Sequence, residues 1–202
     1  MRVHDVTDTD KQTLRCPVDC DRGAWLSGVG LALVVLLVAT PALCGQSPPT
    51  EYQVKAAYLY NFGKFVEWPA NMTVSDSSFN ICVLGQDPFG PTFGTTIAGE
   101  NIRGKNVLLK RLSKAQEAFG CHILFISSSE QVHLKDILAA LDKASVLTVS
   151  DMPQFTRRGG MIQFVTEENR VRFEVNLTSA ERNGLTLSSQ LLKVAISVRR
   201  SS

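Results

Sequence analysis

The stretch Cys121-His122-Ile123-Leu124-Phe125-Ile126-Ser127 decides the fold, because it is apolar at nearly every position. Two other short runs share this character, Phe79-Asn80-Ile81-Cys82-Val83-Leu84-Gly85 and Val146-Leu147-Thr148-Val149-Ser150. A strand that faces water on one side alternates apolar and polar residues, whereas a strand covered on both faces does not. The three runs therefore predict buried parallel strands with helices on both faces of the sheet.

The segments beside these strands carry helix signals that suit crossover connections. Ser127-x-x-Glu130 resembles a capping box, in which the side chains at the two ends satisfy free backbone donors. Short helices are also marked by a proline near the start or a glycine at the end. These signals predict helices over Asp87–Ile97, Ser113–Phe119 and Gln131–Lys143, and Lys105–Lys110 is predicted as a further strand.

The two ends of the domain have different patterns. Apolar residues recur at helical spacing from Glu51 to Trp68, with Val54, Tyr58, Phe62, Phe65 and Val66 on the predicted buried stripe. Near the C-terminus, two runs joined by a polar turn predict a β-hairpin over Met161–Val165 and Val171–Val175. We expect Thr178 to open a short helix as a capping box, and Ser188 to cap a last helix that runs through Val198.

These elements predict one α/β domain over residues 51–200. It has three layers, with a largely parallel sheet flanked by helices and a C-terminal β-hairpin. Without residues 1–44 the chain keeps 158 residues, which is enough for a single domain with a substantial core.

An apolar run near the N-terminus decides the compartment. The residues from Trp25 to Cys44 carry no charge, Arg22 precedes them, and Pro41-Ala42 lies near their end. A basic edge, an apolar core and a small-residue exit are the parts of a secretory signal peptide, and a core of about 15 residues is short for a membrane span of about 20. We therefore expect residues 1–44 to be a leader and residues 45–50 a short tail.

An uncleaved membrane anchor is the alternative. The first 22 residues are long for a leader and mix four basic with five acidic residues, and a start site assigned too far upstream would also explain them. Both interpretations place the rest of the chain outside the cytoplasm. We therefore expect an exported protein.

Charge gives no sign of nucleic-acid binding. After removal of the leader, 17 basic and 14 acidic residues remain, a net charge of +3, and the basic residues do not cluster on one segment. Proteins that bind nucleic acid usually present a dense basic patch. We expect no nucleic-acid partner.

Two cysteines, Cys82 and Cys121, remain in the expected mature chain. An even pair in an oxidising compartment favours a disulfide. Such a bond would close a loop of about 40 residues and contribute about 4 kcal/mol in the chain-entropy model. Two buried free thiols are the alternative, since cysteine packs well in strands.

No convincing catalytic or metal-binding set is present in the sequence. His122 lies in a buried type of strand, and it cannot act with Cys121 because adjacent strand residues point to opposite faces. His133 is expected to be solvated. Asp87 and Asp151 end strands at the edge where such sheets bind ligands, but both also suit turns and caps. We expect no enzyme activity, no cofactor and no metal site.

Two regions carry candidate partner-binding residues. Trp68 falls off the buried stripe of the first helix, and exposed aromatic residues often anchor partners, although packing against a helix end is an equal alternative. Arg172 and Glu174 share the polar face of the hairpin, where they could pair with each other or contact a partner. We assign partner binding to these three residues and to Asn176.

Several of the motifs occur together in a known family. They are Tyr52–Phe62 with Phe65-x-x-Trp68-Pro69, Ile81–Gly85 with Asp87-Pro88-Phe89, Cys121–Ser127, Leu147–Asp151, Gly159–Ile162 leading to Arg172–Asn176, and Gly184-Leu185-x-Leu187-Ser188-Ser189-x-Leu191-Leu192. Each motif alone is weak, but their order covers almost the whole mature chain. From Glu51 to Val198 the chain resembles the YfiR family of small periplasmic proteins.

The resemblance implies a regulator that is not an enzyme. It implies a repressor that binds the periplasmic part of an inner-membrane diguanylate cyclase and holds it inactive, and that an OmpA-like outer-membrane lipoprotein sequesters. It also implies a redox-responsive homodimer in which Cys82 and Cys121 pair. Family members can carry a second cysteine pair near the hairpin, which this chain lacks, so a redox switch built on that pair is in doubt.

Two other functions compete with this hypothesis. The first is a periplasmic small-ligand sensor that acts on a different membrane signalling protein. The second is an enzyme, against which the missing acid/base cluster argues. A histidine kinase instead of a cyclase among the neighbouring genes would favour the sensor.

Overall fold

The computed structural model describes residues 48–70 and 77–200. The predicted leader over residues 1–44 lies outside them. Within the described ranges, no helix combines the length and apolar character needed to cross a membrane.

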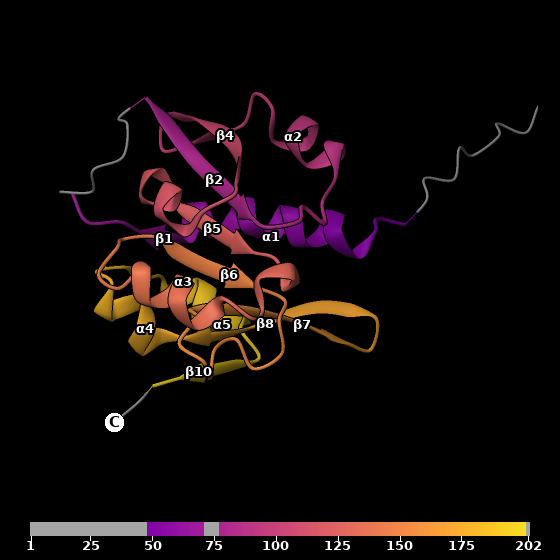
Figure 1. The fold of residues 1–202 in the computed structure, drawn as a ribbon. Helices are drawn as coiled ribbons and strands as arrows, with labels where there is room; N and C mark the ends of the chain where they lie inside the picture. Colours follow the sequence, from indigo (N-terminus) through magenta and orange to yellow (C-terminus); the bar gives the residue numbers. More distant parts are fainter. Residues whose placement is uncertain (1–47, 71–76, 201–202) are drawn as a thin grey trace, which may run out of the picture. The chain divides into compact units, whose positions relative to one another are not determined.

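Eight strands of the described residues form one sheet, in the order β10-β8-β7-β6-β5-β2-β4-β3 (Figure 1). Their bounds are β2 Ser78–Leu84, β3 Asn101–Ile102, β4 Lys105–Leu112, β5 Ile123–Ile126, β6 Leu147–Ser150, β7 Ile162–Glu167, β8 Arg170–Asn176 and β10 Ser197–Arg199. A separate antiparallel pair joins β1 Val66–Glu67 to β9 Thr186–Leu187.

The helices connect and cover these strands. They are α1 Glu51–Phe65, α2 Pro91–Ile97, α3 Leu134–Ala140, α4 Leu177–Arg182 and α5 Ser189–Val194, with the 3-10 helices η1 Ala115–Gly120 and η2 Ser128–Glu130. The pairs β4–β2, β2–β5, β5–β6 and β6–β7 are parallel, and β7–β8 is an antiparallel hairpin. The predicted fold class, a largely parallel sheet flanked by helices with a C-terminal hairpin, is confirmed.

The two faces of the sheet bury separate apolar clusters, as continuous apolar strands require. On β5, Ile123 and Phe125 face the cluster that contains α1, α2, α4 and α5, whereas Leu124 and Ile126 face the cluster that contains η1 and α3. Figure 1 shows α3 in front of the sheet and α1 behind it. All four strand residues are buried.

The α1 helix differs from its prediction in both its end and its buried face. Thr50 caps its start through a capping box with Gln53, but the helix ends at Phe65, because the next two residues pair with β9 as strand β1. The buried face contains Leu59 and Lys55, whereas Phe65, predicted on the stripe, is exposed.

The residues predicted to start a helix were wrong in three places. The α2 helix starts at Pro91 after Gly90 instead of at Asp87, and the segment after Ser127 forms the 3-10 helix η2 before α3 begins at Leu134. The cap of α4 is Asn176, whose Oδ1 accepts from the Ser179 N–H at 3.0 Å, instead of Thr178. Propensity alone does not show which of several small polar residues takes the extended cap conformation.

The last predicted helix is two elements. Ser188 caps α5 as expected, but the helix ends at Val194, and Val198 lies in the edge strand β10, which pairs in parallel with β8. β-branched residues fit a pleated strand well. The tertiary pairing therefore overrides the apparent helical periodicity.

Candidate partner-binding site

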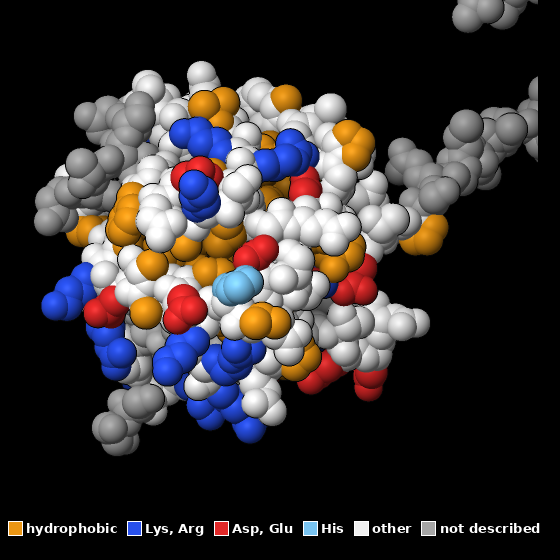
Figure 2. Space-filling view, in the orientation of Figure 1, with side chains coloured by type: hydrophobic (Ala, Val, Ile, Leu, Met, Phe, Trp, Pro, Cys, Tyr) orange, Lys and Arg blue, Asp and Glu red, His pale blue; other side chains and the backbone are white. Residues whose placement is uncertain are grey.

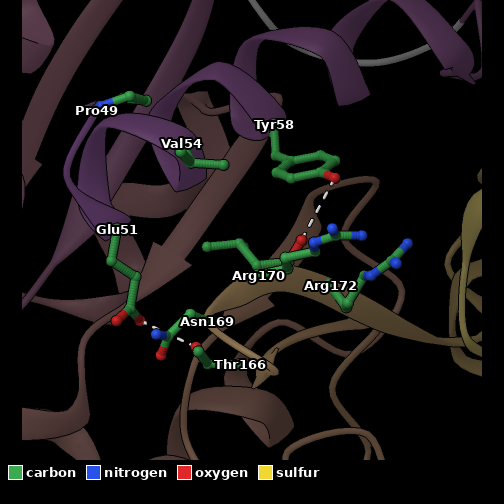
Figure 3. Close-up of a pocket in the computed structure, with 9 residues that line it drawn as sticks. Pro49, Glu51, Val54, Tyr58, Thr166, Asn169, Arg170 and Arg172 are labelled. Carbon is green, nitrogen blue, oxygen red and sulfur yellow. Dashed lines mark hydrogen bonds between the residues drawn. The ribbon is translucent and has the colours of Figure 1, made fainter.

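A groove of about 600 Å³ lies between the start of α1 and the β7–β8 hairpin (Figure 3). Its apolar wall contains Val54, Tyr58 and Val171, and its polar wall contains Thr166 and Asn169 of the hairpin. The Tyr58 hydroxyl donates to the Val171 carbonyl at 3.5 Å, which ties the helix to the strand. The hairpin turn has positive φ at Glu168 and Asn169, as a two-residue primed turn requires.

Two arginines give this groove its positive charge. Arg170 and Arg172 are two residues apart on β8, so both side chains leave the same face of the strand, and both are exposed. Figure 3 shows their side chains extending from β8 on one side of the groove. A groove with apolar walls and two guanidinium groups can hold a carboxylate beside an apolar side chain.

The acidic side of the groove is neutralised internally. Glu51 Oε1 lies 2.7 Å from Lys55 Nζ and accepts a hydrogen bond from Thr166 Oγ1 at 3.3 Å. Lys55 also contacts Asp151 Oδ2 at 2.7 Å, and the Tyr52 hydroxyl donates to the same oxygen at 3.0 Å. This network joins α1 and the hairpin to the carboxyl end of β6.

The pKa shifts of Lys55 and Tyr52 are those that this network of contacts would cause. Burial alone lowers the pKa of Lys55, but its hydrogen bonds to Asp151 and Glu51 raise it above its ordinary value. Burial and the Asp151 carboxylate raise the pKa of Tyr52. Both groups therefore keep their protons at neutral pH, and Asp151 is held in an internal contact.

Of the four predicted partner-binding residues, Arg172 alone lines this groove. Glu174 and Asn176 follow it on the same face of β8, but Thr156 contacts both: its Oγ1 donates to Glu174 Oε2 at 3.2 Å, and its carbonyl accepts from Asn176 Nδ2 at 2.9 Å. The structure thus brings Arg172, Glu174 and Asn176 onto one strand face and gives two of them internal partners.

Trp68 lies apart from these three residues, beside β2 and β5. Its ring packs edge-on against Phe79 and His122, and its Nε1 donates to the His122 carbonyl at 3.2 Å. The indole is half-buried. Its geometry is that of a side chain that covers the core at the end of β1.

His122 is a packed core residue, as expected from its strand. Its ring stacks on Phe79 with centroids 4.2 Å apart, and its Nδ1 accepts a hydrogen bond from the Asn80 N–H at 3.1 Å. Burial, together with the charges of Lys105 and Lys110, lowers its pKa to about 4. The imidazole is therefore neutral at pH 7.

A disulfide joins Cys82 of β2 to Cys121, which lies just before β5. Their Cα atoms are 6.0 Å apart, and both residues are fully buried in the cluster beneath α3. The covalent bond therefore links two adjacent parallel strands across the crossover that contains β4 and η1.

The described residues contain no group of three or more His, Cys, Asp or Glu side chains that could hold a metal ion. Sequence reasoning missed Lys55, and the available signal was its position as the one cation within the apolar stripe of α1. It also missed Tyr58 as a groove residue, because helical spacing placed that ring in the core.

A family model described as YfiR/HmsC-like matches residues 52–196. The chain belongs to this family. The family consists of periplasmic regulators linked to diguanylate cyclase signalling, and its function is regulatory instead of catalytic.

No curated protein matches the chain. A crystal structure of a conserved domain protein from Vibrio cholerae O1 biovar El Tor strain N16961 is similar at 13% identity and a TM-score of 0.44, over 59% of this chain and 54% of that chain. The chain thus spans about half the length of that protein.

Proposed function

We propose that this protein inhibits a membrane-bound diguanylate cyclase from the periplasm and so lowers cyclic di-GMP signalling. The observation that carries the proposal is the family match, which covers almost all of the described domain. The Cys82–Cys121 disulfide supports it, because such bonds persist in oxidising compartments. So does the apolar leader-like run that precedes the domain.

The partner in this proposal is the periplasmic part of the cyclase. Arg172, in the groove between α1 and the hairpin, is the strongest of the four candidate contacts, because it is exposed while Trp68, Glu174 and Asn176 have internal contacts. Sequestration by an OmpA-like outer-membrane lipoprotein and formation of a homodimer are further parts of the proposal.

The test is to delete the gene and measure cellular cyclic di-GMP and surface adhesion. Both are expected to rise, and a plasmid copy of the gene is expected to restore them. Unchanged levels in a strain whose neighbouring cyclase gene is intact would contradict the proposal. Export is checked in the same strain by N-terminal sequencing of the protein from the periplasmic fraction.

A small-ligand sensor is the second candidate, favoured by the size of the groove. Its volume of about 600 Å³ lies within the range of about 300–1,000 Å³ that is usual for ligand pockets. Binding of a periplasmic metabolite there, with no response of cyclic di-GMP to the gene deletion, would support the sensor over the inhibitor.

A further inference from the structure

A second surface of the domain combines exposed apolar side chains with an open strand edge. Seven large apolar side chains are exposed among the described residues. Four of them lie close together near the end of α1 and along the segment from α5 to β10: Phe65 (36% exposed), Val194 (62%), Ile196 (41%) and Val198 (37%). The other three lie elsewhere, Leu108 in β4, Phe119 in η1 and Val132 in the turn before α3.

Two of these apolar residues border a groove between α1 and α5. This groove has a volume of about 340 Å³, and its lining is mainly aromatic and aliphatic. Phe65 and Val194 line it, and Phe173 of β8 lies at its inner end. The Ile196 N–H donates to the Phe173 carbonyl at 3.0 Å, so the groove continues directly into the edge of the sheet.

The outer side of β10 is an open edge. β10 is the last strand of the sheet, it pairs with β8 alone, and its three residues are exposed. The Asn176 N–H bonds to Met161, so the backbone groups of Glu174 and Asn176 face β7, and those of Phe173 and Val175 face β10. Val198 is in register with Val175, so its own N–H and C=O groups face the open side. Such an edge can accept an added strand.

The side chains of this edge also alternate. Val198 is in register with Val175, which faces the cluster with α1 and α5, so Ile196 and Val198 point to the groove face. Arg199 points to the opposite face. A strand added here would place its apolar residues against Ile196 and Val198, and its alternate residues beside Arg199.

The charges of this region are of one sign. Residues 182–202 contain four basic residues and no acidic residue. Exposed Lys64 and Lys193 stand on α1 and α5, the two walls of the groove, and neither they nor Arg199 has an acidic partner within 4 Å in the described ranges. On the face that Figure 2 shows, Lys and Arg side chains gather toward the side where α4 and β10 lie.

We propose that the β10 edge and the α1–α5 groove bind an extended segment of the signalling partner in which apolar residues alternate with Asp or Glu. This inference rests on the proposed function for the identity of the partner, but the surface and the chemistry of the segment come from the strand geometry and the charge. A second copy of this chain fits less well, because pairing of two β10 strands would place two basic edges, each with Arg199, alongside one another.

The surface is tested on the exported protein with a synthetic peptide that alternates glutamate and valine. Amide chemical-shift changes are expected in residues 61–65 and 190–200, and a peptide with lysine in place of glutamate is expected to cause none. No shift changes with the glutamate peptide, shift changes elsewhere, or equal effects of the two peptides would overturn the proposal.

Two variants and one control sharpen the test. Val198→Pro removes the N–H on the open side without removing a bond to β8, and Val194→Glu adds a repulsive charge to the groove. Each is expected to weaken peptide binding by about tenfold or more, which is about 1.4 kcal/mol. Val132→Glu places the same charge on an apolar residue that is 86% exposed in the turn before α3, and it is expected to bind like the wild type.

A measurement of cyclic di-GMP in cells distinguishes an error in the proposed surface from an error in the proposed function. If the wild-type protein lowers cyclic di-GMP and both surface variants do so equally, the surface is wrong and the function stands. If the wild type has no effect, the function is wrong, and the peptide titration still decides the surface. Binding to phosphatidylglycerol vesicles without peptide binding, or a dimer that Val194→Glu dissociates, would also overturn the proposal.

Discussion

Lys55 Nζ lies 2.7 Å from Asp151 Oδ2, although 96 residues separate the two in the chain. The ammonium is almost fully buried and also contacts Glu51. This contact ties the first turns of α1 to the end of β6 and so to the parallel core. Glu51, the second partner of Lys55, lines the groove in which Arg172 lies.

Asp151→Ala is expected to lower the free energy of unfolding by about 3 kcal/mol, because it leaves a buried ammonium with only one carboxylate. It also removes the acceptor of the Tyr52 hydroxyl. Urea unfolding followed by circular dichroism measures the change. Asp142→Ala, at an exposed position, is the control and is expected to change stability by less than about 0.5 kcal/mol; equal effects of the two variants would contradict the prediction.

His122 is expected to make the protein less stable in acid. Its pKa is about 4 in the folded state and 6.5 when unperturbed, so between these values the unfolded chain binds a proton that the folded chain does not. Stability contributed by this group is therefore complete above pH 6.5 and declines as pH falls toward 4, by about 3 kcal/mol at most.

Urea unfolding at several pH values between 4 and 7 tests this dependence. His122→Asn removes the titrating ring while keeping an acceptor for the Asn80 N–H, and it is expected to flatten the slope of stability against pH. His133→Asn, at an exposed position, serves as the control and is expected to leave the slope unchanged. A steep slope that survives in His122→Asn would assign the acid sensitivity to other groups.

The Cys82–Cys121 bond is expected to be a structural disulfide that reductant reaches only after unfolding. Both residues are fully buried, and their separation of 39 residues predicts a loss of about 4 kcal/mol in the chain-entropy model when both are replaced by alanine. Mass spectrometry after alkylation should find Cys82 and Cys121 unmodified in the native protein and both alkylated after denaturation with reductant. Alkylation of either residue in the untreated native protein would refute the bond.

Gly160→Ala is expected to destabilise the loop before β7 by about 2 kcal/mol. A Cβ atom at this position would lie 2.1–2.4 Å from ring atoms of Phe155, which is itself fully buried and cannot move aside easily. Gly120→Ala is the matched control, because nothing lies within 4 Å of its Cβ and its φ is not positive. Thermal unfolding compares the two variants, and similar midpoints would argue against close packing at Gly160.

Arg172→Glu is expected to weaken repression of cyclic di-GMP while changing stability by less than about 0.5 kcal/mol, because the side chain is exposed. Trp68→Ala is expected to have the opposite balance, with a large effect on stability and a small effect on repression. It should lower the free energy of unfolding by about 3 kcal/mol. Lys135→Glu reverses a charge on α3, away from the groove, and controls for the change in net charge. Wild-type repression by Arg172→Glu would remove this residue from the candidate site.

Local sequence patterns were sufficient to predict the strands of the parallel core. Continuous apolar runs identified β2, β5 and β6 as strands covered on both faces, because burial on two sides leaves no room for polar alternation. The hairpin was also predictable, since Val171, Phe173 and Val175 alternate with polar residues and β7 precedes them across a short turn. Of the four residues predicted for partner binding, Arg172 alone lies in the groove.

Contacts between distant segments decided those parts of the fold and of the groove that local patterns did not predict. Lys55 was not predicted as a site residue, and it contacts Asp151 and Glu51 only in the folded chain. Val198 was predicted in the last helix, but it pairs with β8 as part of an edge strand. Asn176 became the cap of α4 because the end of β8 gave it the extended backbone that a cap needs. Periodicity and capping depend on neighbours in sequence, whereas the pairing of charges and strand edges depends on which segments the folded sheet brings together.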